Sequence, residues 1–531
     1  MDVKQALLQG KTTLGIEFGS TRIKAVLTDA DSNPIASGDY TWENRLENGV
    51  WTYSLAEIYT GLRSCYRSLK QDVREKYSVT LKTVGAIGVS AMMHGYMALD
   101  ENGELLVPFR TWRNTITAEA SDILTEKFNF NIPQRWSIAH LYQAILNGEP
   151  HLDRLCRLST LAVYIHYMLT GNFVAGVGEA SGMFPIDPQT GNYDSGMLEE
   201  FDSLIAGKSL PFKHVEDILP EVLSAGEEAG RLTKQGAALL DEDADLEDGI
   251  PFCPPEGDAG TGMTATNSVR VRTGNVSAGT SIFSMIVLEK PLSRVYRQID
   301  IVTTPSGKPV AMVHCNNCTG EIDAWVKLFG EVISLAGADI PKSKLYDLLY
   351  YKAMEGDESG GALMAYNFIS GEPVAGVDNG CPMYLRTPGS ALGLAEFMRV
   401  QLYSAFASLK IGNDILLKRE NVTLDNISAH GGLYKTEGVG QKITAAALNT
   451  RVTVMKTAGE GGPWGMAVLA GYMLGRQDGE SLEDYLDSRV FASAESTTVS
   501  PEEATVKGFD EFTERYIAFL DAARKAGECA V

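Results

Sequence analysis

The sequence predicts an α/β fold with two related domains, and two observations support this prediction. The first is a pair of similar segments, one near the N-terminus (residues 14–31) and one in the middle of the chain (residues 274–290). Each is an apolar, β-branched run that breaks at a glycine followed by two hydroxyl residues and then resumes, which is typical of a β-hairpin. The second observation is the length of 531 residues, which exceeds what one hydrophobic core usually supports.

The tips of the two hairpins have the composition of phosphate-binding turns. Glycine lets the backbone approach a ligand closely, and free N–H groups together with hydroxyls form a concave donor site for phosphate oxygens. Two copies, one at the start of each half, therefore predict two phosphate clamps that face each other. The tips consist of Gly19, Ser20 and Thr21 in the first hairpin and Gly279, Thr280 and Ser281 in the second.

Further helices and strands follow the first hairpin. Apolar residues at helical spacing behind Ser54, a suitable N-cap, predict a helix over residues 54–77. The small-residue run 84–92 is typical of a buried strand. Residues 132–170 are predicted to be mostly helical, with Gly171 as the C-cap.

The second half begins after an acidic, loop-like stretch over residues 239–260, which we interpret as the seam between the domains. The predicted domains are residues 12–265 and 266–531. Residues 389–417 predict a long amphipathic helix. Residues 426–435 predict a strand that ends in a Gly-Gly turn before another helix, an arrangement that suits a nucleotide because a helix N-terminus favours phosphate.

The composition limits the partners of the protein. Its net charge is −22, with 46 basic and 68 acidic residues, which argues against a general nucleic-acid or anionic-membrane surface. Anionic ligands would therefore need a local clamp. No stretch reaches the ~18 continuous apolar residues of a membrane span, and the N-terminus lacks an apolar signal core. We expect a cytoplasmic protein with a small-molecule substrate and no membrane or nucleic-acid partner.

The seven cysteines are scattered and odd in number, so they do not resemble a disulfide framework, and we expect reduced thiols. Cys315 and Cys318 have a suggestive spacing, but no second pair or histidine lies at zinc-finger distance, and we assign them no metal. Residues 480–531 carry no motif that indicates a function. The sequence leaves the oligomeric state open, with a homodimer as one candidate assembly.

From about Thr12 to about Arg476 the motifs resemble, in order, those of the FGGY family of carbohydrate kinases, relatives of actin, hexokinase and the heat-shock chaperone ATPases. Residues 15–21 resemble the family's G-x-D-x-G-[ST]-[ST] hairpin, residues 277–281 its second phosphate hairpin and residues 431–435 its adenosine motif; residues 459–467 are similar to its E-x-x-A-x-G-A-A helix start. The resemblance implies two actin-like (ribonuclease H-like) domains with a catalytic cleft between them, and ATP and Mg²⁺ as cofactors. The ATP and phosphate ligands that it implies are Gly19, Ser20, Thr21, Lys24, Gly279, Thr280, Ser281, Gly431, Gly432 and Lys435.

The resemblance also implies a catalytic base and a sugar site. Asp258 matches the Asp of the family's G-D-x-x-x-[AG] stretch, where a carboxylate takes the proton of the sugar hydroxyl that attacks the γ-phosphorus. Residues 90–95 resemble the S-G-Q-M-H-G motif of D-xylulose kinases and some sedoheptulose kinases, so Met93 and His94, with Asp258, are candidate sugar contacts. Trp112 is similar to the Trp of the family's W-x-D-x-R-T segment, which borders the sugar.

Several residues depart from the family pattern. The magnesium-associated Asp of the first hairpin is Glu17, which keeps a carboxylate but reaches one methylene further. Asn114 and Ile116 replace an acidic residue and an Arg near the sugar, and Met92 replaces a Gln. The sequence therefore predicts a divergent sugar kinase of the xylulose kinase branch. Kinases for another ketose or polyol, such as L-ribulose or sedoheptulose, and a nucleotide-binding regulator without kinase activity remain as alternatives.

Overall fold

The computed structural model describes residues 2–456 and 461–530, which form two compact units. Unit 1 comprises Met1–Val269, Asp300–Val310 and Glu460–Ser493. Unit 2 comprises Arg270–Ile299, Ala311–Gly459 and Ala494–Val531. Both units are thus discontinuous in sequence. The division into residues 12–265 and 266–531 stays a prediction, and unit 1 differs from its first domain chiefly by the return of the chain near residue 460.

Unit 1 contains a five-stranded sheet in the order β13-β6-β1-β2-β3. β1 pairs antiparallel with β2, which confirms the first predicted hairpin, and parallel with β6, which confirms the strand predicted within residues 84–92. β13 continues the parallel part of the sheet. The strands are β1 (Thr13–Phe18), β2 (Arg22–Thr28), β3 (Pro34–Thr41), β6 (Ala86–Ala91) and β13 (Glu256–Gly257).

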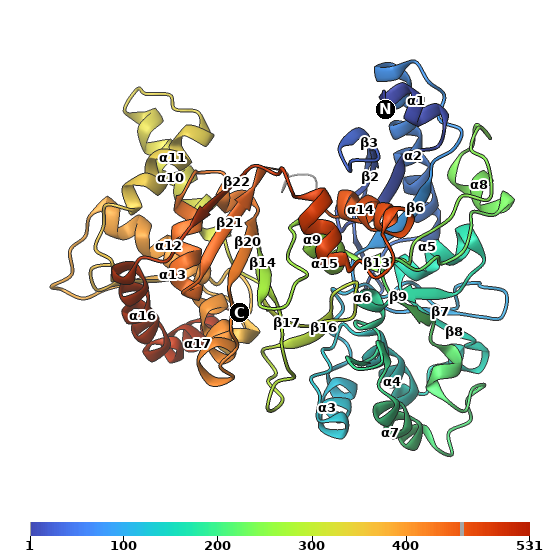
Figure 1. Ribbon diagram of the computed structural model, residues 1–531. Helices are drawn as coiled ribbons and strands as arrows, with labels where there is room; N and C mark the ends of the chain where they lie inside the picture. The colour runs from blue at the N-terminus through green and yellow to red at the C-terminus, as the bar shows by residue number, and fades with distance from the viewer. Residues whose placement is uncertain (1, 457–460, 531) are drawn as a thin grey trace. The chain divides into compact units, whose positions relative to one another are not determined.

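Helices cover both faces of this sheet (Figure 1). On one face, α2 (Leu55–Tyr77) and α5 (Leu161–Thr170) share a hydrophobic core with the strands. On the other face, α14 (Gly461–Gly475) lies so close to β1 that a Cβ atom on Gly15 would overlap its backbone. α14 in turn packs against α9 (Asp258–Ala265). The first turn of α14 is thereby brought to the end of β1.

The predicted helix over residues 54–77 is confirmed, because the Ser54 side chain accepts a hydrogen bond from the Glu57 amide at 3.2 Å and caps α2. Residues 132–170 form two helices, α4 (Ser137–Asn147) and α5, separated by a 3₁₀ turn and by β8 (Arg157–Ser159). Gly171 caps α5 in the left-handed conformation, as predicted. The stretch 239–260 is only partly loop, since β13 and the start of α9 lie in it.

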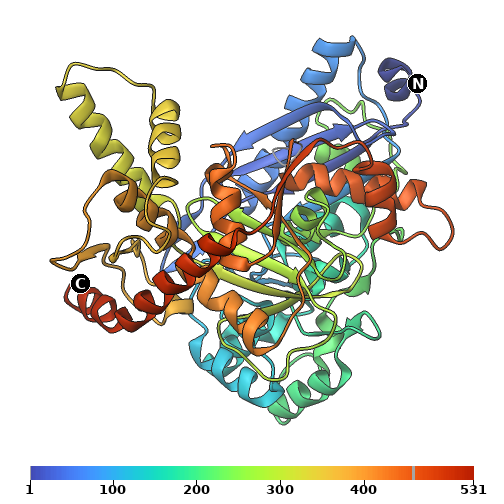
Figure 2. The ribbon, with the colours of Figure 1, turned by 60° about the vertical axis from the view of Figure 1, so that its left-hand side comes forward.

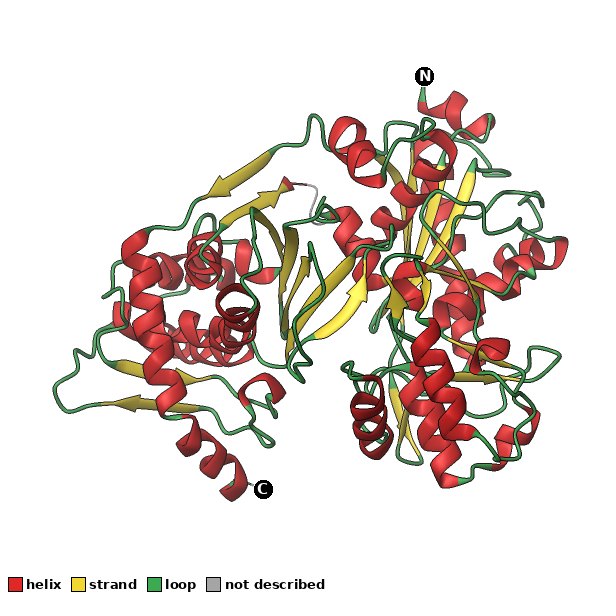
Figure 3. Ribbon diagram, turned by 60° about the horizontal axis from the view of Figure 1, so that its bottom comes forward, coloured by secondary structure: helices red, strands yellow, loops and turns green. Residues whose placement is uncertain are grey.

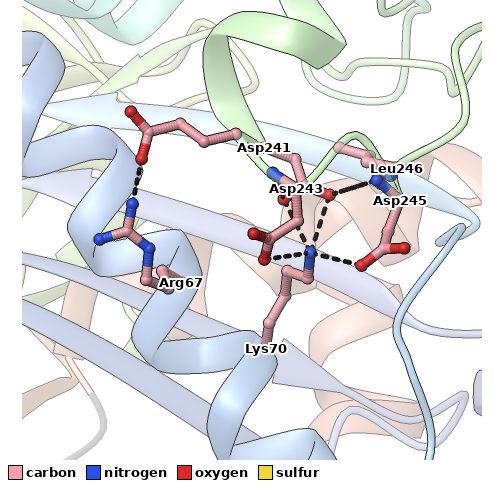
Figure 4. A network of polar contacts seen from close by, with 7 residues as sticks. Arg67, Lys70, Asp241, Asp243, Asp245 and Leu246 are labelled. Atoms are coloured by element: carbon pink, nitrogen blue, oxygen red, sulfur yellow. Dashed lines mark hydrogen bonds and ion pairs between the residues drawn. The ribbon is translucent and has the colours of Figure 1, made fainter.

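A buried lysine ties α2 to the acidic loop after α8 (Lys234–Leu240) (Figure 4). The Lys70 ammonium lies 2.7 Å from one carboxylate oxygen of Asp241, 3.2 Å from Asp243 and 2.9 Å from Asp245. Asp241 also accepts backbone hydrogen bonds from its own loop. Lys70 is thus the cation around which this acidic loop folds.

In unit 2, six strands lie side by side in the order β17-β15-β14-β20-β21-β22 (Figure 3). β14 pairs antiparallel with β15, which confirms the second predicted hairpin, and parallel with β20. β20 pairs parallel with β21. The strands are β14 (Thr273–Ala278), β15 (Ile282–Val287), β17 (Pro309–Cys315), β20 (Asn426–His430), β21 (Arg451–Met455) and β22 (Ser496–Val499).

The helices of unit 2 include α12 (Leu394–Asp414), which confirms the long helix predicted within residues 389–417. α13 (Val439–Leu448) is the predicted helix after the Gly-Gly turn. α10 (Gly320–Leu335) and α11 (Lys342–Ala353) run beside each other, and α16 (Glu503–Ala518) leads into α17 (Leu520–Cys529) at the C-terminus (Figure 2). Among the described residues, no helix combines the length and apolar character needed to cross a bilayer.

Further helices and strands complete the two units. They are α1 (Val3–Leu8), β4 (Arg45–Glu47), β5 (Val50–Thr52), β7 (Met97–Leu99), α3 (Ala118–Phe128), β9 (Val174–Gly176), α6 (Val177–Ala180), β10 (Ile186–Asp187), β11 (Asn192–Tyr193), α7 (Ser195–Ile205), β12 (Glu221–Leu223), β16 (Asp300–Thr303), β18 (Leu363–Tyr366), β19 (Met383–Arg386) and α15 (Leu482–Tyr485).

Candidate active site

The carboxyl ends of three neighbouring strands in unit 1 place polar side chains together. In register, Glu17 of β1 lies beside Ser90 of β6, and Ser90 lies beside Glu256 of β13. Lys24 of β2 is opposite Glu17 on the other side. Ends of parallel strands are where α/β folds usually bind ligands. The sheet therefore gathers carboxylates, a hydroxyl and an ammonium at one edge.

Glu17 lies in a setting that favours its neutral form. Desolvation, and then the charge of Asp258, raise the pKa of Glu17 to about 8, while the charge of Lys24 lowers it. Its carboxylate reaches the first turn of α14, where a Cβ atom on Gly462 would overlap it. A bound cation would offset these effects, since it would stabilise the ionised carboxylate.

Asp258 is the first residue of α9, directly after β13. Its Oδ1 accepts a hydrogen bond from the Met93 amide at 3.2 Å, which joins the predicted base to the predicted sugar loop. Although the side chain reaches solvent, desolvation by the surrounding protein raises the pKa of Asp258 to about 6, against the lowering effect of backbone N–H groups. Asp258 is thus ionised at neutral pH, and its pKa is close enough to neutral for the carboxylate to accept a proton.

The predicted sugar residues Met93 and His94 follow β6 and are both buried. His94 has a φ of 71°, in the left-handed region that side chains rarely adopt. Its Nδ1 lies 3.2 Å from the Gly182 carbonyl oxygen, so this hydrogen bond requires the Nδ1–H tautomer, and its ring stacks on Trp136 with centroids 6.1 Å apart. Backbone strain of this kind concentrates at functional sites.

Trp112, the remaining predicted sugar residue, contacts the first phosphate hairpin. Its indole N–H donates to Ser20 Oγ at 3.3 Å. The turn itself is closed by a hydrogen bond from the Gly19 amide to the Arg22 carbonyl, and Tyr53 donates to the Ser20 carbonyl at 2.6 Å. Unit 1 therefore brings together the predicted sugar and phosphate residues that it contains.

Asn114 has a structural role. Its side-chain oxygen accepts from the Trp51 amide at 2.9 Å, and its Nδ2 donates to the carbonyls of Trp51 at 2.8 Å and Thr111 at 2.9 Å. The buried amide thus fixes the loop that carries Trp112 to β5. Ile116, the other departure near the predicted sugar site, is exposed.

In unit 2, the second phosphate hairpin lies beside the predicted adenosine motif. Gly431 follows β20, has a φ of 112°, and leaves no room for a Cβ atom because the Ala278 carbonyl is next to it. The Gly279 carbonyl accepts hydrogen bonds from the Thr319 amide at 3.1 Å and hydroxyl at 2.9 Å, and the Thr280 carbonyl accepts from the Cys318 amide. The remaining predicted ATP and phosphate ligands of unit 2 lie on the same two turns. They are Ser281, Gly432 and Lys435.

Two features lie partly or wholly outside these sites. Of the predicted glycine-rich helix start, Gly459 and Glu460 lie outside the described residues. Cys315 and Cys318 are buried, and burial raises the pKa of both thiols. Within residues 2–456 and 461–530, no group of three or more His, Cys, Asp or Glu side chains is arranged to hold a metal ion.

Sequence reasoning missed two buried glutamates beside Asp258, namely Glu179 of α6 and Glu256 of β13. Glu256 accepts hydrogen bonds from the amides of Gly178 at 3.3 Å and Glu179 at 3.0 Å, and desolvation raises its pKa to about 8. For Glu179 the available signal was a single Glu within the apolar, small-residue run 174–184, which indicates a buried carboxyl group, whereas Glu256 stands in the acidic stretch 239–260 and carried no such signal.

Comparisons with known proteins agree with this arrangement. Residues 12–262 match the FGGY family of carbohydrate kinases, N-terminal domain, and residues 274–474 match its C-terminal domain. A xylulose kinase from Haemophilus influenzae is 22% identical over 519 residues, covering 96% of this chain and 99% of that protein. A xylulose kinase from Staphylococcus epidermidis is 22% identical over 486 residues, covering 88% of each.

Solved structures share the fold at low sequence identity. A gluconate kinase from Lactobacillus acidophilus superposes with a TM-score of 0.78 at 17% identity, covering 97% of this chain and 99% of that one. A ligand-bound xylulose kinase from the same organism gives a TM-score of 0.76 at 17% identity, with the same coverage. The predicted α/β fold with two actin-like domains is confirmed.

Proposed function

This chain belongs to the FGGY family of carbohydrate kinases and is an ATP-dependent sugar kinase, and we propose that its substrate is a ketopentose such as D-xylulose. The observation that carries the proposal is the hydrogen bond from the Met93 amide to Asp258 Oδ1, because it couples the candidate base to the loop that resembles that of D-xylulose kinases. The xylulose kinases among its relatives support the same substrate class.

We assign the role of general base to Asp258. The sugar hydroxyl loses its proton as it attacks the γ-phosphorus, and an ionised carboxylate within hydrogen-bond reach accepts that proton. A pKa of about 6 leaves Asp258 ionised at neutral pH and still basic enough to accept a proton. Met93 and His94 would orient the sugar, and Trp112 would border it.

We propose nucleotide contacts within each unit. In unit 1, Ser20, Thr21 and Lys24 would contact phosphate oxygens through hydroxyls, amides and one ammonium group. In unit 2, the turn at Gly279 and the turn at Gly431 would bind phosphate and adenosine. Their proximity within unit 2 supports this assignment.

The carboxylates of Glu17 and Asp258 fit Mg²⁺, which prefers hard oxygen ligands and usually keeps several waters while binding substrate phosphates. The charge of Asp258 raises the pKa of Glu17, so the two carboxylates lie near enough to interact. We propose Glu17 as the residue that holds Mg²⁺. When bound, the ion would neutralise charge that develops on the phosphates.

The experiment is a coupled ADP-release assay with ATP and Mg²⁺ over D-xylulose, L-ribulose, sedoheptulose, gluconate and glycerol. The wild-type protein is run beside Asp258→Asn. We expect the highest kcat/KM with D-xylulose and a loss of about 10²-fold or more in the Asn variant, because an amide cannot accept the proton.

Other outcomes would change the assignment. Preference for another sugar of the panel would replace D-xylulose as the substrate while leaving Asp258 as the base. Full turnover by Asp258→Asn would contradict the general-base role. Absence of turnover with every sugar, combined with tight ATP binding, would favour the nucleotide-binding regulator instead.

A further inference from the structure

A buried glutamate lies directly behind the candidate base. Glu179 belongs to the short helix α6 and is completely inaccessible to solvent. Neither of its carboxyl oxygens makes a well-formed hydrogen bond to a described residue, although the Thr160 hydroxyl lies near them. Buried carboxyl groups are normally paired, so an unpaired one calls for a specific reason.

The contacts of Glu179 point to the turn that carries Asp258. A Cβ atom on Gly257 would lie 2.6 Å from Glu179 Oε2 and 2.9 Å from Met93 Cγ. The carboxyl group therefore packs on the α-carbon that precedes Asp258, beside the Met93 side chain. Asp258 in turn accepts the hydrogen bond from the Met93 amide. Glu179 thus packs on the residue that precedes the acceptor of that hydrogen bond, near the side chain of its donor residue.

Glu256 connects the same two elements, but its side chain comes from β13 and reaches the backbone of α6. Its carboxyl group belongs to the residue before Gly257 and accepts hydrogen bonds from the amides of Gly178 and Glu179. Two residues beyond α6, Gly182 accommodates the His94 ring, because a Cβ atom there would lie 2.6 Å from His94 Nδ1. The segment 177–182 is therefore packed against the turn that carries Asp258 and against His94 of the sugar loop.

The protonation states of Glu179, Glu256 and Asp258 support a role for a neutral Glu179. Burial, and also the charges of Glu256 and Asp258, raise the pKa of Glu179 well above its usual range, while the nearby Thr160 hydroxyl lowers it. The pKa of Glu256 is raised to about 8. Near neutral pH both glutamates keep their protons, so Asp258 is the ionised carboxylate of the three.

We propose that Glu179 is a positioning residue, whose carboxyl group packs on Gly257 and fixes the Asp258 turn against the Met93 amide, so that the base and the sugar loop keep one mutual geometry. The proposal rests on the proposed function of Asp258. It assigns no contact between Glu179 and the substrate. A small displacement of a catalytic group is enough to reduce turnover strongly, so Glu179 would act on kcat through the position of Asp258.

The first test compares Glu179→Gln with Glu179→Ala, using the sugar that the wild-type enzyme phosphorylates fastest. The amide of Gln has the shape of a neutral carboxyl group, so we expect kcat within about twofold of wild type, whereas Glu179→Ala lowers kcat by about tenfold or more. KM for ATP stays unchanged in both variants. The matched control is Glu221→Gln, an exposed glutamate on the neighbouring β12, which leaves all parameters unchanged.

The second test is a double-mutant cycle that adds Gly257→Ala, a variant that remains informative on its own if Glu179→Ala is unstable. Gly257→Ala introduces a methyl group that collides with Glu179 Oε2 and also lies 2.9 Å from Met93 Cγ, so it lowers kcat alone, and Glu179→Ala removes the first of these two collisions. We expect the double variant to lose at least about threefold less in kcat than the product of the single losses, which is the signature of direct coupling.

Three results would overturn the proposal. The first is a kcat of Glu179→Ala equal to wild type in a folded protein. The second is an equal loss in Gln and Ala variants, which would mean that the charge of Glu179 is required. The third is strict multiplicativity in the cycle. A wild-type enzyme that phosphorylates no sugar would instead overturn the proposed function, which separates the two failures.

Discussion

The carboxylate of Glu17 occupies the space beside the α-carbon of Gly462, in the first turn of α14. A Cβ atom at position 462 would overlap Glu17 Oε2 and lie 2.9 Å from Thr261 Oγ1. The longer side chain at position 17, which departs from the family's Asp, thus fits here because position 462 has no side chain. A helix N-terminus also favours a nearby carboxylate.

We predict that Gly462→Ala lowers kcat and that Glu17→Asp partly restores it in the double variant. The added methyl group displaces the Glu17 carboxylate, and an Asp, shorter by one methylene, withdraws from the collision. The measurement is kcat together with the Mg²⁺ concentration at half-maximal rate. Gly475→Ala, at the other end of the same helix, serves as the control, because no described atom lies within 4 Å of its added Cβ. An unaltered Mg²⁺ dependence in Gly462→Ala would argue against Glu17 as a magnesium residue.

The pH dependence of the reaction should report Asp258. Its pKa is raised to about 6, and the active form is the ionised carboxylate, so kcat/KM for the sugar rises with pH through about 6 and is lost below it. A profile of kcat/KM between pH 5 and 8 at fixed ionic strength measures this limb. In Asp258→Asn the residual activity should lack the limb. An unchanged limb in that variant would assign the titration to another group.

The structure also predicts the effect of restoring the family residue at position 114. Asn114→Asp keeps an acceptor for the Trp51 amide but places an oxygen against the carbonyls of Trp51 and Thr111, to which Nδ2 now donates. Because buried acceptors would face each other without a proton between them, we expect a loss of about 1–3 kcal/mol in stability. Thermal unfolding beside the exposed control Asn102→Asp tests this expectation. A lower sugar KM with an unchanged Tm would instead indicate that position 114 contacts the sugar.

The sequence predicted those parts of the fold and candidate site that depend on local patterns. The two hairpins follow from β-branched runs interrupted by Gly19 and Gly279, and the helix behind Ser54 follows from its cap and apolar spacing. Glu179 and Gly462 could not be predicted in this way, because their importance arises from packing between segments far apart in the chain. Asn114 shows the same limit, since its departure from the family pattern suggested a lost sugar contact and the structure shows a backbone clamp.

The ion-pair cluster around Lys70 should stabilise unit 1. Lys70 and Asp241 expose 9% and 3% of their side chains, so Lys70→Met leaves a carboxylate that is buried without its cation. Breaking such a pair costs about 3–5 kcal/mol, which corresponds to a Tm lower by roughly 5–8 °C in a unit of this size.

Lys76→Met on the same helix is the matched control for Lys70→Met. Lys76 forms an exposed pair with Asp72 at i,i+4 spacing, and such pairs contribute only about 0.3–0.5 kcal/mol. Differential scanning calorimetry of the two variants should therefore show a large shift for Lys70→Met and almost none for Lys76→Met. Adding 1 M NaCl should reduce the small contribution of Lys76 further and leave most of the Lys70 effect, because buried pairs are screened much less than exposed ones. Equal shifts in the two variants would show that burial of the Lys70 cluster does not govern its contribution.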